Sequence, residues 1–213
     1  MILKVLQIKK EAGDAFSVIF ENPENRFYPG QYIEIEDRCF SIASSPSESC
    51  LMVTTKPGIS DFKKRFAKTK PGDTWESSHP AGTVTIDEVD PAVFLAGGIG
   101  ITPFRSMIKW AVDRKLDLPM TLIYTNSDPD FIFKDELDDW LKQLPNLEIH
   151  YIITAKEVRL NEDKLKQLIS SIYHLAPIYY LAGPPKMVDD FEKILLNMGI
   201  DSTNIRTDRY DGY

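Results

Sequence analysis

Four consecutive residues near the start of the chain, Arg38-Cys39-Phe40-Ser41, carry side chains suited to holding a flat, phosphorylated molecule. In an extended strand, Arg38 and Phe40 share one face and Cys39 and Ser41 share the other. A guanidinium can fork onto a phosphate, an aromatic ring can stack on a flat heterocycle, and a hydroxyl can bond a ring nitrogen. The same residues also suit a structural role as a surface arginine, a core phenylalanine and a capping serine. Alone, the tetrapeptide leaves both interpretations open.

Two glycine turns in the second half of the chain each join an apolar run to a helical pattern. The first turn reads Gly97-Gly98-Ile99-Gly100-Ile101-Thr102-Pro103, where Thr102 predicts a helix N-cap and Pro103 a first helical residue. The second reads Gly183-Pro184-Pro185-Lys186-Met187. Missing side chains let a diphosphate approach the backbone, and the N–H groups at a helix start favour anions. The two turns therefore predict one dinucleotide site, although each alone fits a tight turn without a ligand.

The strands and helices that must position these residues are predicted from the spacing of apolar residues, and this spacing differs between the two halves of the chain. Up to about Ile86 the runs are short and alternate, as in Ile33 to Glu36 and Thr83 to Ile86, with Pro-Gly turns between them. This predicts an antiparallel β-barrel or sandwich over residues 1–88, beginning with a strand at 1–10 and containing one helix at 61–70. The segment Lys56-Pro57-Gly58-Ile59-Ser60 opens that helix and predicts a second anion site.

The remaining residues, 89–213, predict a doubly wound parallel α/β domain. Four apolar runs are typical of buried parallel strands, and apolar residues at helical spacing follow each of them. The runs are 92–96, 120–124, 149–153 and 178–182, and the helical patterns cover 104–111, 137–144, 165–172 and 188–195. In such a sheet both glycine turns lie at the carboxyl edge, where ligands bind at the reversal of strand order.

Composition and charge narrow the classes of function. A net charge of −7 argues against nucleic acid as the main partner, since phosphate backbones require a basic face. The two cysteines, Cys39 and Cys50, cannot supply the four thiolates of an iron–sulfur cluster, and the histidines show no metal spacing. The chain has no signal-peptide pattern and no apolar run long enough to span a bilayer, so we expect a cytoplasmic protein without a metal.

Taken together and in order, the motifs resemble those of the ferredoxin–NADP reductase-like flavoproteins. Residues 28–32 resemble the family's Pro-Gly-Gln-Tyr turn, 38–41 its Arg-x-Tyr/Phe-Ser flavin motif, and 58–60 its phosphate-holding segment. Residues 96–103 are similar to its nicotinamide-binding loop and 181–187 to its later Cys-Gly-Pro-x-x-Met loop. The resemblance covers nearly the whole chain. It implies an FAD-binding barrel, with FMN the lesser alternative, followed by an NAD(P)-binding domain.

The resemblance also implies roles for individual residues. Ser41 would bond near the flavin atom that takes hydride, and Asp208 matches an acidic residue near the C-terminus, so both are the predicted catalytic residues. A C-terminal aromatic that covers the flavin would be Tyr213, with Tyr210 as the alternative. The predicted cofactor ligands are Arg38, Cys39, Phe40, Ser41, Thr55, Lys56, Gly58, Ile59, Ser60 and Tyr213 for flavin, and Gly97, Gly98, Gly100, Ile101, Thr102, Pro103, Asn126, Gly183, Pro184 and Met187 for the dinucleotide.

Two departures from the family pattern bear on turnover, and one segment bears on the choice of dinucleotide. Ala182 stands where the family often carries cysteine, and Phe40 stands where tyrosine is commoner. After the second α/β strand, Asn126 suits ribose hydroxyls, while Asp128 and Asp130 would repel a 2′-phosphate. This favours NADH, but Lys156 and Arg159 after the third strand leave NADPH open.

The resemblance implies a flavin-dependent oxidoreductase that moves hydride between NAD(P)H and FAD and exchanges electrons with a carrier such as ferredoxin or flavodoxin. Two alternatives stay open: a reductase subunit of an oxygenase or dehydrogenase complex, and a flavin-binding regulator with little turnover. A basic segment around Lys63-Lys64-Arg65, continued by Lys68 and Lys70, could dock an acidic carrier. It could equally be a solvated helix face.

Overall fold

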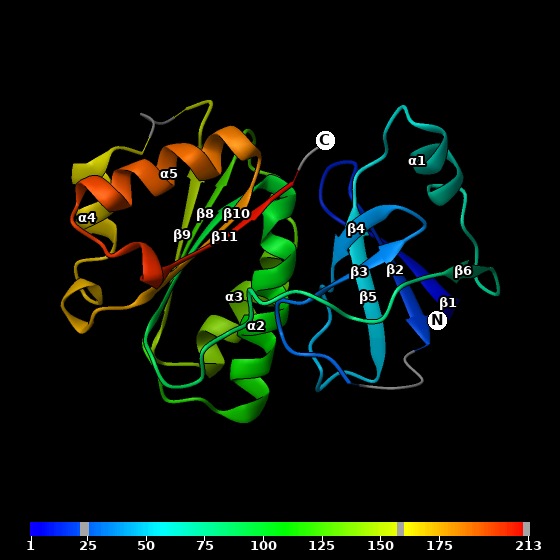
Figure 1. Cartoon of the computed structure of the whole chain (residues 1–213), viewed down its shortest axis with the longest axis horizontal. Helices are drawn as coiled ribbons and strands as arrows, with labels where there is room; N and C mark the ends of the chain where they lie inside the picture. The colour runs from blue at the N-terminus through cyan, green and yellow to red at the C-terminus, as the bar shows by residue number, and fades with distance from the viewer. Residues whose placement is uncertain (22–25, 157–159, 211–213) are drawn as a thin grey trace. The chain divides into compact units, whose positions relative to one another are not determined.

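The computed structural model describes residues 1–21, 26–156 and 160–210. These residues group into two compact units (Figure 1). Of the described residues, the first unit contains those within 1–86 and helix residues Thr102–Arg114, and the second contains Asp87–Ile101 and those from Lys115 to residue 210. The predicted single boundary after residue 88 stays a prediction. Among the described residues, no helix combines the length and the apolar character needed to cross a bilayer.

The first unit is built from antiparallel strands that form a closed ring. One sheet has the order β5-β2-β1-β6, and a second pairs β3 with β4. An isolated bridge between Ile35 and Ser77 links β3 to the end of β6, and another between Ile42 and Val53 links β4 to β5. The predicted antiparallel barrel is therefore confirmed. The elements are β1 (Ile2–Lys10), β2 (Phe16–Glu21), β3 (Tyr32–Ile35), β4 (Arg38–Ser41), β5 (Cys50–Thr55), α1 (Asp61–Phe66) and β6 (Thr74–Glu76).

Alternation along these strands fills the interior of the barrel. Ile33 and Ile35 on β3 are fully buried, while Glu34 between them is exposed. The helix α1 contributes two buried rings to the same core, Phe62 and Phe66. The ring of Phe66 lies with its centroid 5.1 Å from that of Trp75, at an angle of 72°, in the edge-to-face arrangement that aromatic pairs prefer. The barrel core is thus tied to the one helix that the sequence predicts for this half.

Two predictions about the first unit were wrong in detail. Residues 83–86 form no strand, although their residues alternate, because the N–H of Thr85 bonds back to the carbonyl of Thr83 and turns the chain. Ile86 is nevertheless buried. The helix α1 ends at Phe66 rather than near residue 70, because the N–H of Lys68 bonds the carbonyl of Arg65 in a tighter turn.

The second unit has a five-stranded parallel sheet of order β11-β10-β7-β8-β9. Residues from α4 and α5 pack on one face of it, so that Leu165, Val188 and Leu195 share a core with Val93 and Leu95. The predicted parallel α/β fold is confirmed. The elements are β7 (Ala92–Gly97), η1 (Gly98–Gly100), β8 (Met120–Asn126), α3 (Lys134–Gln143), β9 (Leu147–Ile153), α4 (Glu162–Leu168), η2 (Tyr173–Leu175), β10 (Ile178–Gly183), α5 (Pro185–Asn197), η3 (Ser202–Asn204) and β11 (Ile205–Arg209).

The strand β11 has no counterpart among the four predicted strands. It pairs in parallel with β10 at the edge of the sheet, from Tyr179 opposite Ile205 to Gly183 opposite Arg209. Its sequence, Ile-Arg-Thr-Asp-Arg, is polar because an edge strand is only partly covered. Because β11 contains no apolar run, the pattern that predicts the other parallel strands does not predict this one.

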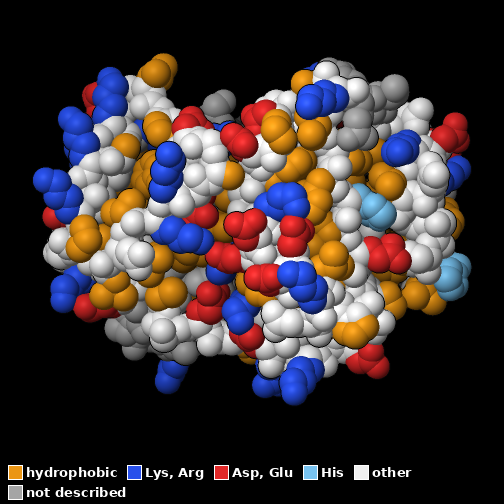
Figure 2. All heavy atoms as spheres, turned by 180° about the vertical axis from the view of Figure 1, so that it is seen from behind, with side chains coloured by type: hydrophobic (Ala, Val, Ile, Leu, Met, Phe, Trp, Pro, Cys, Tyr) orange, Lys and Arg blue, Asp and Glu red, His pale blue; other side chains and the backbone are white. Residues whose placement is uncertain are grey.

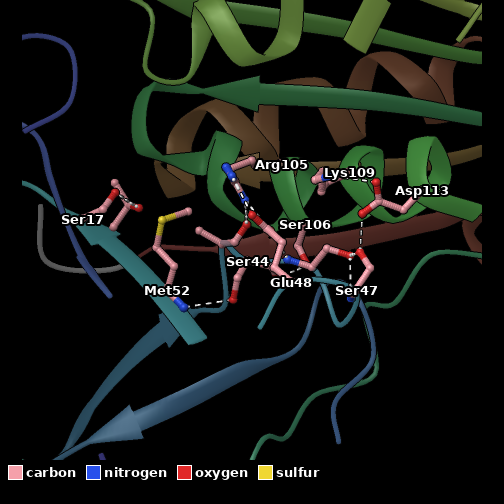
Figure 3. A network of polar contacts seen from close by, with 12 residues as sticks. Ser17, Ser44, Ser47, Glu48, Met52, Arg105, Ser106, Lys109 and Asp113 are labelled. Atoms are coloured by element: carbon pink, nitrogen blue, oxygen red, sulfur yellow. Dashed lines mark hydrogen bonds and ion pairs between the residues drawn. The ribbon is translucent and has the colours of Figure 1, made fainter. Parts of the chain in front are cut away.

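The helix α2 (Ile101–Arg114) follows the first glycine turn but contacts the segment that follows β4. Arg105 is buried and its guanidinium donates to the carbonyl of Ala43 at 2.8 Å and to both carboxylate oxygens of Glu48 at 2.9 and 3.2 Å (Figure 3). The Ser106 hydroxyl donates to the carbonyl of Ser44 at 2.6 Å. A buried arginine requires this complete set of acceptors, because a desolvated charge without partners costs several kcal/mol.

Replacing Arg105 by methionine should destabilise the protein by about 3 kcal/mol, because Glu48 would keep its charge in a partly buried place without its partner. Lys109→Met is the matched control, since Lys109 pairs with Asp113 on the same helix but nearer the surface and should cost less than about 1 kcal/mol. Chemical denaturation of both variants measures the difference. Equal losses would contradict the importance assigned to the buried pair.

Candidate functional site

The strand β4 places the four residues of the predicted flavin motif in different surroundings. Arg38 and Cys39 are exposed, and the Cys39 thiol lies 3.8 Å from a carboxylate oxygen of Glu34, to which it donates. Phe40 is only 3 % exposed, and its ring centroid lies 5.4 Å from that of Phe66. Ser41 is buried opposite Tyr32. The strand thus presents a cation at its start and an aromatic side chain anchored in the core.

The second predicted flavin segment begins at the end of β5. Thr55 is fully buried, and the ammonium group of Lys56 lies 3.8 Å from a carboxylate oxygen of Asp14. Ser60 caps α1, because its hydroxyl accepts the N–H of Lys63 at 3.2 Å. Ile59 is 93 % exposed. Gly58 packs against Lys63, since a Cβ added there would lie 3.0 Å from the Cγ of that lysine.

One side chain connects the two segments, and the sequence did not single it out as a ligand. The ammonium group of Lys63 donates to the Thr55 hydroxyl and lies 5.5 Å from the centroid of the Phe40 ring. Burial, and secondarily the positive charge of Arg38, lower the pKa of Lys63 to about 8. The structure therefore brings Arg38, Phe40, Thr55 and Lys63 together. In the sequence, Lys63 could have been identified from its position. It lies three residues after the N-cap Ser60 and next to Phe62, which is buried.

In the second unit the order of strands reverses between β7 and β10. The chain proceeds from β7 outward to β8 and β9, and then returns to place β10 and β11 on the other side of β7. Ala96 pairs with Ala182, so both glycine turns leave the carboxyl ends of neighbouring strands. Ligands of open α/β sheets bind at such a reversal. The structure thus brings the two predicted dinucleotide turns side by side.

Three glycines lie where the two turns approach each other, and only at Gly100 are all the nearest atoms backbone. A Cβ on Gly100 would lie 2.1 Å from the carbonyl oxygen of Ala182, and one on Gly97 would lie 2.2 Å from the sulfur of Met187. Gly183 has a φ of +151° and would meet the methyl carbon of Met187 at 2.7 Å. Missing side chains at these positions let the two turns approach each other. The sequence predicted these glycines only from the approach of a ligand, and not from the packing of the two turns on each other.

Gly98 differs from the other three glycines. Its φ is +53°, in the left-handed region, and among the described residues beyond its chain neighbours a Cβ added there would have one atom within 4 Å, the side-chain oxygen of Asn126 at 3.9 Å. The carbonyl of Gly98 accepts the hydroxyl of Tyr124 at 2.9 Å. Burial raises the pKa of Tyr124 well above its ordinary value, so the hydroxyl remains a donor. The hydrogen bond from Tyr124 therefore holds the backbone of the turn at Gly98, while the space at the Cβ position of Gly98 is open.

The predicted cap of α2 was wrong. The turn Gly98–Gly100 is already a 3₁₀ helix, and α2 continues from it at Ile101, so Thr102 and Pro103 lie inside the helix. The reason is that the N–H of Ile101 bonds the carbonyl of Gly98, so the helical path begins at Gly98, five residues before the predicted first helical residue Pro103. Ile101 and Thr102 are both buried. In the second turn, Pro184 is the N-cap of α5, and Met187 lies in its first turn.

The segment after β8 is held by its own acidic side chain. Asp128 accepts the amide group of Asn126 at 3.0 Å, the Ser127 hydroxyl at 3.1 Å and the backbone N–H of Asp130 at 2.9 Å. Asn126 also donates to the carbonyl of Asp130 at 3.1 Å. Both hydrogen bonds donated by the amide group of Asn126 are therefore made within the loop that follows β8. Its side-chain oxygen is the atom that lies nearest to the open position at Gly98.

The remaining predicted site residues lie near the C-terminus. Asp208 is half-buried on β11 and pairs with Ala182, which places it beside the second glycine turn. Tyr210 follows, and its N–H donates to the carbonyl of Gly183 at 3.1 Å. Tyr213 and Arg159 lie outside the described residues. Within the described part of the chain, no group of three or more His, Cys, Asp and Glu side chains could hold a metal ion.

Replacing Gly100 by alanine should destabilise the protein by about 2 kcal/mol or more, because the new methyl group would overlap the carbonyl of Ala182. Gly199→Ala is the control: Gly199 has a φ of +83° but nothing within 4 Å of its Cβ position, so only backbone strain of about 1 kcal/mol is expected. Denaturant unfolding compares the two. A Gly100 variant as stable as the control would show that the turns do not require this close approach.

Comparisons with known proteins agree with this arrangement. Residues 94–193 match the family model described as the oxidoreductase NAD-binding domain. A curated relative, the toluate 1,2-dioxygenase electron transfer component of Pseudomonas putida, is 26% identical over 203 residues, which cover 86% of this chain and 59% of the relative. The chain thus spans less than two thirds of that relative's length.

Two solved structures show the fold over nearly the whole chain. Ferredoxin-NADP+ reductase from Plasmodium falciparum has a TM-score of 0.79 at 18% identity, covering 98% of this chain and 95% of that one. A flavohemoglobin from Malassezia yamatoensis, with bound FAD and heme, has a TM-score of 0.81 at 20% identity, covering 98% of this chain and 59% of that one. At these identities the likeness concerns the fold.

Proposed function

We propose, from the premise that this chain is a ferredoxin–NADP reductase-like oxidoreductase module, that it binds FAD in its first unit and a nicotinamide dinucleotide in its second. It would transfer hydride between the two and exchange electrons with a separate carrier. The observation that carries this proposal is the pair of glycine turns packed on each other where the order of the parallel strands reverses.

The residues of the first unit fit a phosphorylated flavin. Arg38 and Lys63 supply two positive charges near the anchored ring of Phe40, and Thr55 adds a hydroxyl. A phosphate group would be held by such charge-assisted hydrogen bonds. Ser41, at the end of β4, would orient the ring system, and Ile59 would cover an apolar part of the cofactor. FAD is preferred to FMN because of the family and the likeness to an FAD-containing structure.

The residues of the second unit would bind and orient the dinucleotide. The open Cβ position at Gly98 and the backbone of the 3₁₀ turn offer an approach for the diphosphate. Gly183, Pro184 and Met187 would line the nicotinamide side, with Asp208 beside them. Flavin supplies the exchange between hydride transfer and one-electron transfer, so the protein must mainly align the two rings and exclude competing reactions.

NADH is the preferred dinucleotide in this proposal. Asp128 is oriented by three donors, and Asp130 follows it, so a 2′-phosphate at Asn126 would meet negative charge. Lys156 is the residue that could still bind the 2′-phosphate of NADPH. It lies just after β9, which pairs with β8 so that Ile153 lies opposite Asn126.

Anaerobic stopped-flow mixing of the FAD-loaded protein with NADH and with NADPH tests the function. We expect the flavin absorbance band to bleach with both, and faster with NADH, because Asp128 disfavours the 2′-phosphate. Protein that stays colourless after incubation with FAD would overturn the proposal. Bleaching with neither dinucleotide would instead support a flavin-binding regulator with little turnover.

A second candidate role is that of a reductase component of an oxygenase system. It is favoured by the P. putida relative, which is named as the electron transfer component of a dioxygenase. The 213 residues contain two cysteines, too few for an iron–sulfur cluster, so electrons would pass to a carrier outside this sequence. Stoichiometric co-purification with a partner would favour this role, whereas full turnover of the isolated protein with a small acceptor would favour an independent reductase.

The carrier would be an acidic protein such as ferredoxin or flavodoxin, docked on the basic segment 63–70. The structure reduces the charge available there, since Lys63 turns inward and Arg65 binds Glu36 at 2.7 and 3.0 Å. Lys64, Lys68 and Lys70 are exposed. Near the middle of the face shown in Figure 2, acidic and basic side chains are interspersed. A local basic patch on a protein of net charge −7 would steer an acidic partner.

Replacing both Lys68 and Lys70 by glutamate should raise the KM for an acidic ferredoxin several-fold at low salt, because steering depends on charge. The effect should shrink as salt is added. Turnover with NADH and ferricyanide should not change. Lys164→Glu, on α4 of the second unit, is the control. An unchanged KM in the double variant would assign docking to another surface.

A further inference from the structure

A buried tyrosine near the end of β8 contacts the first glycine turn of the second unit. Tyr124 is fully buried, and its ring packs edge-on against that of Phe131, with the centroids 4.9 Å apart and the rings at 72°. The ring of Tyr151, its partner on β9, lies 6.3 Å away. These aromatic contacts hold the Tyr124 ring in place, so the position of its hydroxyl is set by packing.

The hydroxyl of Tyr124 bonds the backbone of the turn directly. It donates to the carbonyl of Gly98 at 2.9 Å, and the same carbonyl accepts the N–H of Ile101. Both acceptor positions of this oxygen are therefore used, one by β8 and one by the helical turn. The peptide group that begins at this carbonyl is planar, so the two bonds fix the orientation of the whole group. They also keep Gly98 at its left-handed φ of +53°.

A second residue of β8 lies beside the same turn. Asn126 follows Tyr124 by two residues, so the two side chains leave the strand on one face. The side-chain oxygen of Asn126 lies 3.9 Å from the open Cβ position at Gly98. Its amide group is held in the following loop by Asp128 at 3.0 Å and by the carbonyl of Asp130 at 3.1 Å. One face of β8 thus holds the turn at the carbonyl and borders its open position.

Packing alone does not call for a hydroxyl at position 124. Taking a hydroxyl out of water costs free energy that its hydrogen bond only partly returns. A phenylalanine would fill the same space against Phe131 and Tyr151 without that cost. The carbonyl of Gly98 would keep its bond from Ile101, so no buried acceptor would be left unpaired. What the hydroxyl adds is a fixed orientation of the peptide group at the open position of the turn.

We propose that Tyr124 is a positioning residue for the nicotinamide dinucleotide: its hydroxyl orients the peptide group at Gly98 against which the diphosphate binds. The inference rests on the proposed function and adds to it a fully buried residue outside the glycine motifs. The diphosphate keeps the same contacts before and during hydride transfer, so loss of this orientation weakens the bound dinucleotide and its transition state equally. The dissociation constant should therefore change, while the rate within the bound complex should not.

Calorimetric titration of the FAD-loaded protein with NAD+ and with ADP-ribose tests the inference, since both carry the diphosphate and only NAD+ carries nicotinamide. In Tyr124→Phe both dissociation constants should rise about fivefold, the worth of one hydrogen bond. Tyr151→Phe is the matched control, because the Tyr151 hydroxyl donates at 2.8 Å to Asp138 on α3 and not to the turn. Both constants should stay unchanged there. The stoichiometry counts the folded molecules, so the comparison holds even if part of a variant unfolds.

Anaerobic stopped-flow mixing adds a readout that a loss of stability does not imitate. In Tyr124→Phe the NADH concentration that gives the half-maximal rate of flavin bleaching should rise about fivefold, while the limiting rate at saturating NADH stays the same. Reduction by 1-benzyl-1,4-dihydronicotinamide, which donates a hydride but carries no phosphate, should be equally fast in the variant and the unmodified protein.

The outcomes separate this inference from the function on which it rests. Unchanged dissociation constants in Tyr124→Phe would overturn it, as would an equal rise in Tyr151→Phe. A rise for NAD+ without one for ADP-ribose, a lower limiting rate, or slower reduction by the benzyl compound would also overturn it, because the effect would then lie away from the diphosphate. Each of these results leaves dinucleotide binding by the unmodified protein intact. Failure of the unmodified protein to bind NAD+ and ADP-ribose would overturn the proposed function, and this inference with it.

Discussion

The contact between two turns at the carboxyl edge of the parallel sheet constrains much of the second unit. Gly100 lies so close to the carbonyl of Ala182 that no side chain fits between them, and the flexible end of the Met187 side chain packs over Gly97. The first turn forms a 3₁₀ helix at Gly98–Gly100, and α2 continues directly from it at Ile101. The backbone offered to a dinucleotide is the result of packing between protein atoms as much as of any requirement of the ligand.

The first unit contains several positively charged side chains in buried or half-buried places, although the net charge of the protein is negative. The Phe40 ring packs against Phe62 and Phe66 at centroid distances of 5.8 and 5.4 Å, and the Lys63 ammonium group lies 5.5 Å from its centroid. Elsewhere in the same unit charge is compensated locally, as between Arg105 and Glu48.

The sequence predicts the parts of the fold that depend on long apolar runs and on clear turn residues. The strands β7 to β10 and the helices that follow them were found because buried parallel strands are continuously apolar. The edge strand β11 was missed because it is polar, and residues 83–86 were taken for a strand because alternation does not reveal a missing partner. Motif residues such as Arg38 and Gly98 could be named from spacing, whereas the direction of the Lys63 side chain depends on the burial of Phe62 and on the cap at Ser60.

The grouping of α2 with the barrel has a consequence for synthesis of the chain. The carbonyls of Ala43 and Ser44 and the carboxylate of Glu48 find their partners on residues Arg105 and Ser106, which leave the ribosome some sixty residues later. A nascent barrel ending near residue 88 would expose these acceptors to water and leave one wall uncovered. The contacts that Arg105 and Ser106 make with the first unit therefore become available only after β7, the first strand of the second unit, has been synthesised.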